Sequence, residues 1–523
     1  MKRLALLFAL CLPVAAVATA MSPQTATLAS RIDAVIDQPR YAHADWGIAV
    51  LSLDNGRTLY AHRADKLAQP ASTAKLFTAA LTLATLGADA RIPTRLVSAA
   101  PLRHGRLDGP LLLYGMGDPT LGTPQANPDW ADDLAAQLAT HGIHAIRGDL
   151  IADAGYFSGP QLGSGWEASD LLGWFAAPAS ALSVHENIVA LTVTPAAEAA
   201  APARLDFAPA IAAPPLQGRL LTTAAGTAEE VNFYRAPGEA TLHAFGGLAL
   251  DTPAHTYRLA IPDPARQAGT ELREALARHH VRLQGRLRVL AWPQDDAALL
   301  DHARTLAEVR SPTTAQILTQ GLKRSQNLYL QNLLKIAGVH AQAAATGEAG
   351  APAGFPGSEA WGLHALRLLL ERIGIAPATV QLEEGTGLAR GDLVTPTALV
   401  QLLRYLAAQP DGAAVRAMLP VAGVDGTLAW RLREAPTADK VQAKTGSMRH
   451  VHSLAGYLTR ADGEQLAFAI MLNNTVHEEG EPPATRDIDA IVDLLATWRE
   501  HEKPSAPVRN PDVVARAASD ASP

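Results

Sequence analysis

The segment Pro70–Leu76 constrains the fold of this chain most strongly, because it sets a serine and a lysine one turn apart where a helix begins. Pro70 stops the helix from extending backwards, and good helix formers follow from Lys75 to Leu86. Ser72 and Lys75 therefore share one face. A serine hydroxyl needs a base within hydrogen-bond reach to act as a nucleophile, and a desolvated lysine amine can be that base. The alternative is an ordinary amphipathic helix with a polar first turn.

The segments around this helix predict an α+β fold. A short amphipathic helix is expected over residues 25–37, and two alternating apolar runs, 46–51 and 58–61, form a β-hairpin around Asp54-Asn55-Gly56. Amphipathic patterns predict later helices over residues 269–279, 314–336, 359–373, 397–408 and 487–499. Alternating patterns predict strands over residues 442–447, 452–458 and 465–473.

The sequence changes in character between residues 91 and 264, where proline, glycine and alanine are frequent and long helical patterns are scarce. We expect an inserted, mostly β region of one or two subdomains, ending at Pro262-Asp263-Pro264. Short β-like runs recur in it, at 111–114, 150–152, 188–193 and 257–261. The catalytic domain would then comprise a first part, 21–90, and a second part, 265–499, and the polar tail, 500–523, would be disordered.

The first twenty residues predict export. A basic start, an apolar run over residues 4–17 and an Ala18-Thr19-Ala20 end are typical of a signal peptide cleaved after Ala20. The run is too short for a membrane anchor and contains Pro13, so we expect a periplasmic protein without a transmembrane anchor. Cys11 is the only cysteine, so the mature chain has no disulfide and no thiol nucleophile. A net charge of −7 argues against a nucleic-acid partner.

A second short motif holds Ser325 and Asn327, two residues apart. This spacing places both side chains on one side only in a loop or at a helix end. Ser325 could pass a proton between Lys75 and a leaving amine, and Asn327 could bind a substrate amide. The alternative is a polar helix face.

A third motif, Lys444-Thr445-Gly446-Ser447, falls on a predicted strand. Lys444 offers a positive charge and Thr445 a hydroxyl, which together suit a carboxylate. Gly446 allows a substrate or another backbone to approach closely, and a substrate could pair as an added strand. The backbone N–H groups of Ser447 and Ser72 would form an oxyanion hole. The alternative is a strand that enters a turn.

The three motifs in this order, in an exported chain with no mature cysteine, resemble the active-site set of the penicillin-interacting serine enzymes, the DD-peptidases and serine β-lactamases. The long gap between Ser72 and Ser325 resembles the D-alanyl-D-alanine carboxypeptidase/endopeptidase family, the class C low-molecular-mass penicillin-binding proteins (S13). Residues 115–121 and 419–428 also match. The resemblance implies a penicillin-binding/serine β-lactamase-like catalytic domain, an antiparallel sheet with a helical cluster, interrupted by the insertion.

The resemblance also implies an activity. Such enzymes cleave D-Ala-D-Ala termini and D-Ala-containing cross-links of peptidoglycan stem peptides through an acyl-enzyme, are acylated by β-lactam antibiotics, and use no cofactor or metal. Carried onto this chain, Ser72 is the nucleophile and Lys75 its base. Ser325 and Asn327 are the second motif, and Lys444 and Thr445 hold the substrate carboxylate.

Family members also contact the far end of the stem peptide, often a diaminopimelate side chain. The matching residues here would be Asp153, Arg390 and Met448. Arg390 follows the stretch 384–388, which has glutamate and threonine where the family usually has aspartate and serine. The alternative for Asp153 and Arg390 is an ordinary solvated charge.

Three other functions stay open. A serine β-lactamase would share these motifs, although the chain has no E-x-x-L-N stretch to hold a deacylating water. A non-catalytic peptidoglycan-binding protein could keep the same fold. A metalloenzyme is the third, but His185-Glu186 and His477-Glu478 lack the second histidine of H-E-x-x-H.

Overall fold

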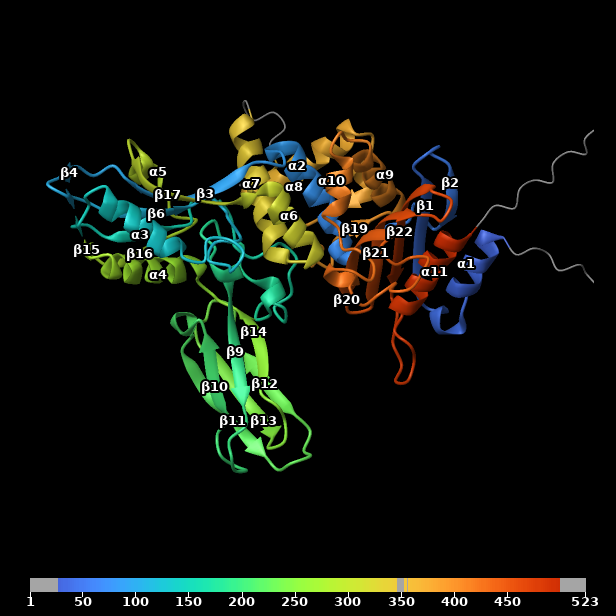
Figure 1. Cartoon of the computed structure of the whole chain (residues 1–523), viewed down its shortest axis with the longest axis horizontal. Helices are drawn as coiled ribbons and strands as arrows, with labels where there is room; N and C mark the ends of the chain where they lie inside the picture. Colours follow the sequence, from blue (N-terminus) through green and yellow to red (C-terminus); the bar gives the residue numbers. More distant parts are fainter. Residues whose placement is uncertain (1–26, 346–351, 355, 499–523) are drawn as a thin grey trace, which may run out of the picture.

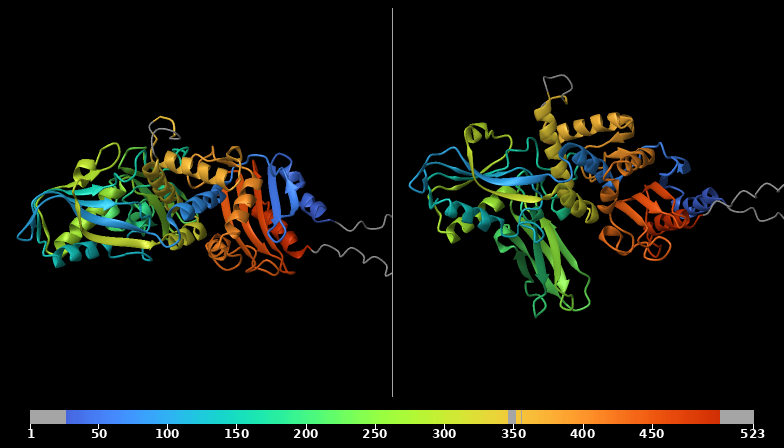
Figure 2. Two further views of the ribbon diagram at one scale, coloured as in Figure 1. Left: turned by 90° about the horizontal axis from the view of Figure 1, so that it is seen from above. Right: turned by 45° about the horizontal axis from the view of Figure 1, so that its top comes forward.

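The computed structural model describes residues 27–345, 352–354 and 356–498, and these form three bodies (Figure 1). The antiparallel body holds the two ends of the described chain, the mixed-sheet body lies at the opposite end of the molecule, and a β-sandwich projects from between them (Figure 2). The predicted signal peptide, 1–20, and the predicted tail, 500–523, lie outside the described residues.

The antiparallel body is built on a five-stranded sheet in the order β2-β1-β22-β21-β20, with every neighbouring pair antiparallel. Its strands are β1 (Asp45–Ser52), β2 (Thr58–His62), β20 (Val441–Met448), β21 (Val451–Thr459) and β22 (Gln465–Asn473). On β22 the large residues at every second position pack against α1 (Leu28–Ile36) and α11 (Thr485–Thr497). The small residues between them, Ala467 and Ala469, lie on the other face, beneath α9 (Pro396–Ala407).

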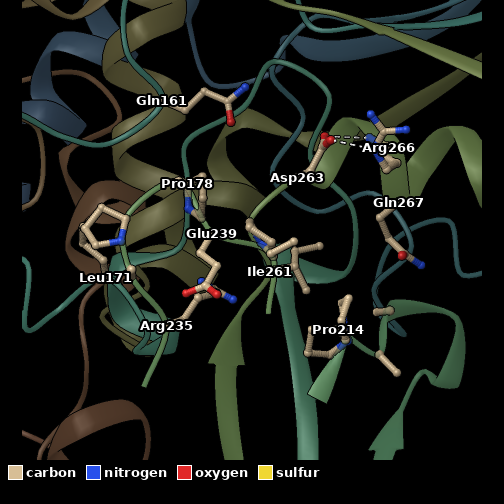
Figure 3. Close-up of a pocket in the computed structure, with 18 of the residues that line it drawn as sticks. Gln161, Leu171, Pro178, Pro214, Arg235, Glu239, Ile261, Asp263, Arg266 and Gln267 are labelled. Carbon is tan, nitrogen blue, oxygen red and sulfur yellow. Dashed lines mark hydrogen bonds and ion pairs between the residues drawn. The ribbon is translucent and has the colours of Figure 1, made fainter. Parts of the chain in front are cut away.

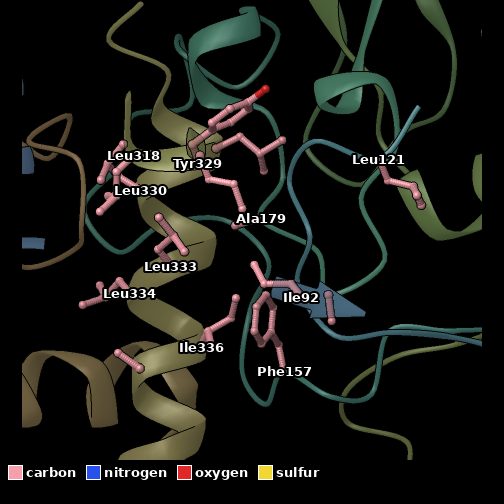
Figure 4. Packing of buried hydrophobic residues seen from close by; sticks show 14 of the residues in the cluster. Ile92, Leu121, Phe157, Ala179, Leu318, Tyr329, Leu330, Leu333, Leu334 and Ile336 are labelled. Atoms are coloured by element: carbon pink, nitrogen blue, oxygen red, sulfur yellow. The ribbon is translucent and has the colours of Figure 1, made fainter. Parts of the chain in front are cut away.

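A cluster of helices covers that other face. Besides α9 it comprises α2 (Lys75–Leu86), α6 (Thr314–Lys323), α7 (Asn327–Ala344), α8 (Ser358–Arg372) and α10 (Gly412–Ala417). Helix α7 is buried on several sides: Leu330, Leu333 and Leu334 point into the cluster, and Ile336 points toward Phe157 of the mixed-sheet body (Figure 4). Helix α7 therefore joins two bodies through one continuous core.

The mixed-sheet body has a five-stranded sheet in the order β16-β8-β6-β3-β17. Helices α3 (Trp130–Thr140) and α4 (Pro264–Arg278) cover one face, and the short α5 (Ala297–Leu300) packs near the other. The strands are β3 (Arg91–Ser98), β6 (Leu111–Gly115), β8 (Leu150–Asp153), β16 (Leu287–Leu290) and β17 (Arg304–Thr313). A smaller sheet, β15-β7-β5-β4, joins β4 (Leu102–Arg103), β5 (Arg106–Leu107), β7 (Ala145–Ile146) and β15 (Arg282–Leu283).

The sandwich consists of two three-stranded sheets, β10-β9-β14 and β11-β13-β12. Its strands are β9 (Ile188–Thr194), β10 (Arg204–Ala208), β11 (Leu216–Thr223), β12 (Glu230–Tyr234), β13 (Leu242–Ala249) and β14 (His255–Ala260). Alternate residues of β9 (Val189, Leu191 and Val193) meet Leu220 and Leu242 of the facing sheet in a separate small core.

The elements confirm the predicted α+β class, the hairpin, helix 75–86 and the three last strands. The predicted helix 314–336 is instead two helices, α6 and α7, because Ser325 between them takes a left-handed backbone (φ +56°) that ends a helix. The mixed sheet also continues beyond residue 264, since β16 and β17 belong to it. Pro264 is the first residue of α4 and Asp263 caps it, so the Pro-Asp-Pro stretch begins a helix. We therefore propose that the insertion extends to about residue 313.

Candidate active site

The first motif lies where the antiparallel sheet meets the helical cluster. Residues Ala71–Ala74 form a short 3-10 turn, and α2 starts at Lys75. The hydroxyl oxygen of half-buried Ser72 lies 2.8 Å from Nζ of Lys75, which is fully buried. Burial lowers the pKa of the Lys75 amine from 10.5 to about 7, although Glu384 and Asp392 act in the opposite direction. A lysine in this state can accept a proton near neutral pH.

A loop from the helical cluster fixes Lys75. Its Nζ donates to the Thr386 carbonyl at 2.8 Å. That loop is held by Glu384, whose carboxylate accepts from the backbone N–H groups of Thr386, Gly387 and Leu388 at 2.6–2.9 Å. Burial and repulsion by Glu384 raise the pKa of Asp392.

The second motif occupies the break between α6 and α7. Ser325 Oγ accepts from Nζ of Lys444 at 2.9 Å, so the second and third motifs are in contact. Asn327 is the first residue of α7, and its Nδ2 donates to the Phe175 carbonyl at 2.7 Å. The loop-or-helix-end geometry predicted for this pair is confirmed.

The third motif lies on β20, the edge strand of the antiparallel sheet. Lys444 is fully buried, and burial together with repulsion by Lys75 lowers the pKa of its amine well below the usual value. Thr445 Oγ1 donates to Thr427 Oγ1 at 2.7 Å, which sets two hydroxyls side by side. Ser447 is exposed next to them.

Gly446 allows the strand to approach the nucleophile turn. A Cβ atom there would lie 2.2 Å from Ser453 Oγ, 2.7 Å from the Pro70 carbonyl oxygen and 3.0 Å from Ala71 Cβ. Ser453 Oγ itself donates to that Pro70 carbonyl at 2.6 Å. The close approach predicted at Gly446 is therefore that of this chain's own backbone just before Ser72.

Arg390 and Met448 lie at the rim of this site. The Arg390 carbonyl accepts from Gln69 close to the first motif, and its guanidinium lies 3.6 Å from Glu167. Arg390 and Arg449 both act electrostatically on Asp170, three residues beyond Glu167. Half-buried Met448 ends β20. The structure therefore places a cluster of mixed charge beside the third motif.

Asp153 lies elsewhere. It is fully buried at the end of β8, in the mixed sheet, where Oδ1 accepts from the Gly155 N–H at 2.8 Å and Oδ2 has no partner among the described residues. Burial raises its pKa from 3.8 to about 7, with a further contribution from Asp296. The residue is neither a solvated charge nor a neighbour of Arg390. The acidic residues that do face Arg390, Glu167 and Asp170, lie in an irregular loop without a sequence pattern.

A cavity of about 590 Å³ lies outside this site, between the sandwich, α4 and the loop that carries Leu171 (Figure 3). Arg235, Glu239 and the Asp263–Arg266 ion pair line it, and none of the motif residues does. It is separate from the chemistry described above.

A family model matches residues 28–497 of the chain, and it describes the D-Ala-D-Ala carboxypeptidase 3 (S13) family. The chain belongs to this family. It is 34% identical over 501 residues to a D-alanyl-D-alanine carboxypeptidase of Actinomadura sp. (strain R39), covering 94% of this chain and 88% of that one. It is 28% identical over 419 residues to D-alanyl-D-alanine carboxypeptidase DacB of Haemophilus influenzae, covering 77% and 80%.

The fold of this S13 member also matches a solved structure. The crystal structure of penicillin binding protein 4 (dacB) from Haemophilus influenzae aligns with a TM-score of 0.77 at 24% identity, over 89% of this chain and 98% of that one. A second structure of that protein, complexed with a novel β-lactam, aligns with a TM-score of 0.72 at 22% identity. The family, the fold class and the class of enzyme predicted from the sequence, a serine-type D-Ala-D-Ala carboxypeptidase, are confirmed.

Two properties of the S13 chain concern metals and membranes. Within residues 27–345, 352–354 and 356–498, no three histidine, cysteine, aspartate or glutamate side chains gather as a metal site would require. His185 and Glu186 instead bind Glu271 and Arg324. None of the helices described has the length and apolar character needed to cross a bilayer.

Proposed function

We propose that Ser72 of this S13 enzyme is acylated by peptides that end in D-Ala-D-Ala. One observation carries the proposal: Ser72 Oγ lies 2.8 Å from the amine of a fully buried lysine whose pKa is about 7. The neutral amine of Lys75 takes the hydroxyl proton as Oγ attacks the carbonyl carbon of the penultimate D-Ala. The N–H groups of Ser72 and Ser447 stabilise the resulting oxyanion.

Ser325 contacts Lys444, and Lys444 lies close enough to Lys75 for the two amines to repel each other, which supports a proton path between Lys75 and Ser325. As the C–N bond breaks, the amine of the terminal D-Ala takes a proton through Ser325 from protonated Lys75 and leaves. A water molecule then attacks the acyl carbon and gives one proton back to Lys75. Ser72 Oγ takes that proton from Lys75 as it departs, and the second proton of the water stays on the released carboxylic acid, which restores the site.

The edge position of β20 supports binding of an extended peptide as an added strand. Lys444, Thr445 and Thr427 would hold the terminal carboxylate. An arriving carboxylate favours the charged form of Lys444, which counteracts the low pKa caused by burial. Asn327 would hold the substrate amide.

The mixed-charge cluster at the rim supports peptidoglycan stem peptides as the substrate. Arg390 and Arg449 could hold the carboxylate of a zwitterionic side chain such as diaminopimelate, and Glu167 and Asp170 its ammonium group. We infer from the leader that the enzyme acts in the periplasm, on D-Ala termini and cross-links, and that β-lactam antibiotics acylate the same serine.

The proposal is tested by the intact mass of the mature protein after incubation with benzylpenicillin, beside Ser72→Ala, and by D-Ala release from a stem peptide. A stable adduct of one penicillin on the native protein only, with D-Ala release, is expected. Rapid release of hydrolysed penicillin would favour a serine β-lactamase. If neither an adduct nor D-Ala release is observed, a non-catalytic peptidoglycan-binding protein would be favoured.

A further inference from the structure

A carboxylate outside the three motifs holds the second motif from behind. Glu186 precedes strand β9 at the base of the sandwich, and its side chain is 7% exposed. A carboxylate this deeply buried is retained only where its charge is neutralised and its oxygen atoms accept hydrogen bonds.

Four side chains meet this carboxylate, and three of them come from the stretch that carries Ser325 and Asn327. Arg324 makes a two-pronged ion pair with Glu186, at 2.6 Å and 3.0 Å. Gln326 Nε2 donates to it at 3.1 Å and Tyr329 OH at 3.0 Å. The two residues that flank Ser325 in the chain are thus both fixed to one acceptor.

The backbone around Glu186 is strained in a way that aims its side chain. His185, Glu186 and Asn187 are three consecutive residues with left-handed φ, at +51°, +58° and +56°. Non-glycine residues hold such a conformation only where the surroundings impose it. His185 Nδ1 lies 2.8 Å from the Gly122 carbonyl, and Asn187 Nδ2 donates to the Pro178 carbonyl at 2.7 Å. These contacts on both sides hold the turn and direct Glu186 at the second motif.

Ser325 needs such support. Its own φ is +56°, a conformation that serine does not favour, and its hydroxyl must stay within 2.9 Å of Lys444 Nζ. In this turn Ser325 contacts the third motif, through Lys444. The residues on either side of it are held by Glu186, so the carboxylate fixes the strained turn from the opposite side.

The same carboxylate reaches the partner of Asn327. Arg258 of β14 donates to Glu186 at 3.3 Å, and its guanidinium stacks 4.5 Å above the Trp174 ring. Trp174 precedes Phe175, whose carbonyl accepts from Asn327. Glu186 therefore connects to both residues of the second motif, one through Arg324 and one through Arg258.

We propose that Glu186 is a positioning residue that holds Ser325 in line for proton delivery to the leaving amine. The inference rests on the role of Ser325 in the proposed function. Loss of the carboxylate would leave Arg324 and Gln326 without their acceptor and allow the Ser325 turn to relax. A shift of the hydroxyl by about 1 Å lowers the rate of a positioned proton transfer by about 100-fold.

The test compares two leaving groups. An amine must be protonated as it leaves, so cleavage of a D-Ala-D-Ala amide needs Ser325. A thiolate leaves without a proton, so cleavage of a matched thioester does not need Ser325. In Glu186→Ala we expect kcat/KM for the amide to fall about 100-fold and that for the thioester by less than about fivefold. Partial unfolding would lower both values equally, so the amide-to-thioester ratio separates positioning from stability.

Glu308→Ala is the matched control. Glu308 on β17 is also held by two arginines, Arg95 and Arg310, but it lies in the mixed-sheet body away from the motifs. This control substitution should leave the amide-to-thioester ratio unchanged. An unchanged amide-to-thioester ratio in Glu186→Ala, or an equal fall of that ratio in Glu308→Ala, would overturn the proposal.

A double-mutant cycle tests the route through Arg324. If Glu186 acts through its ion pair, Arg324→Ala should also lower the amide-to-thioester ratio. The ratio of the double variant should then be no lower than that of Glu186→Ala alone. Additive falls would contradict that route. Failure of the proposed function gives a different result, because the native enzyme would then cleave neither substrate.

Discussion

The neutral fraction of Lys75 should set the pH dependence of acylation. With a pKa of about 7, its amine is about 9% neutral at pH 6, half neutral at pH 7 and about 91% neutral at pH 8. An ordinary lysine, with a pKa of 10.5, would be only about 0.03% neutral at pH 7. The rate of acylation should therefore rise about tenfold between pH 6 and pH 8 and then level off.

The assay is the second-order rate constant for acylation by a chromogenic β-lactam, measured by stopped flow from pH 5.5 to 9.5. Enzyme held at each pH and returned to pH 8 should regain its rate, which separates titration from unfolding. Lys335→Met is the matched variant, because burial also lowers the pKa of that lysine, to about 8, away from Ser72. Three results would refute the assignment of this pH dependence to Lys75. They are a flat profile, a rate that still rises tenfold per pH unit through pH 9, and a midpoint that moves in Lys335→Met.

Three further substitutions test the site and the buried carboxylate of the mixed sheet. Gly446→Ala would bring a methyl group within 2.2 Å of Ser453 Oγ and 2.7 Å of the Pro70 carbonyl, so acylation should fall at least about 100-fold, and a rate within threefold of native would contradict this. Asp153→Asn should raise Tm more at pH 8 than at pH 5. The folded-state pKa of Asp153, about 7, exceeds the ordinary 3.8, so the native protein loses stability as pH rises through 7 and the variant does not. Equal gains in Tm at the two pH values, measured by calorimetry, would be inconsistent with that burial. Arg390→Ala should lower kcat/KM about tenfold for a stem peptide with diaminopimelate and less than twofold for one with alanine there, and equal losses would remove Arg390 from substrate recognition.

The chemistry of the site could be predicted because each motif is local in the sequence. Ser72 and Lys75 are one helical turn apart, and the structure keeps them on one face with their reactive atoms 2.8 Å apart. The two-residue spacing of Ser325 and Asn327 favoured a helix end, and the break between α6 and α7 is such an end. Periodicity likewise located the strands of the antiparallel sheet, because alternate burial leaves a regular pattern.

Contacts between distant segments could not be predicted in this way. Glu167 and Asp170 reach Arg390 from an irregular loop, and Glu186 meets Arg324 only because a strained turn directs it there. The surroundings of Asp153 could not be predicted either, since a carboxylate at the end of a buried strand has the same sequence appearance whether it faces a site or a core. The end of the insertion that we propose, near residue 313, could not be located from the sequence for a similar reason, because the pattern of α4 shows which face it buries and not against which sheet.

The pairing of the first and last strands has a consequence for how the enzyme is made. Gln69, just before the nucleophile turn, is bound through its backbone to Asn473, which lies 404 positions later at the end of β22. Strand β1 likewise has β22 as its partner, so the central sheet cannot close until nearly the whole chain has been synthesised. Such non-local pairing is slow, since a very long loop must close before any contact compensates for it. A nascent chain that ends before β22 would carry all three motifs without an assembled site, which delays hydrolysis until synthesis is almost complete.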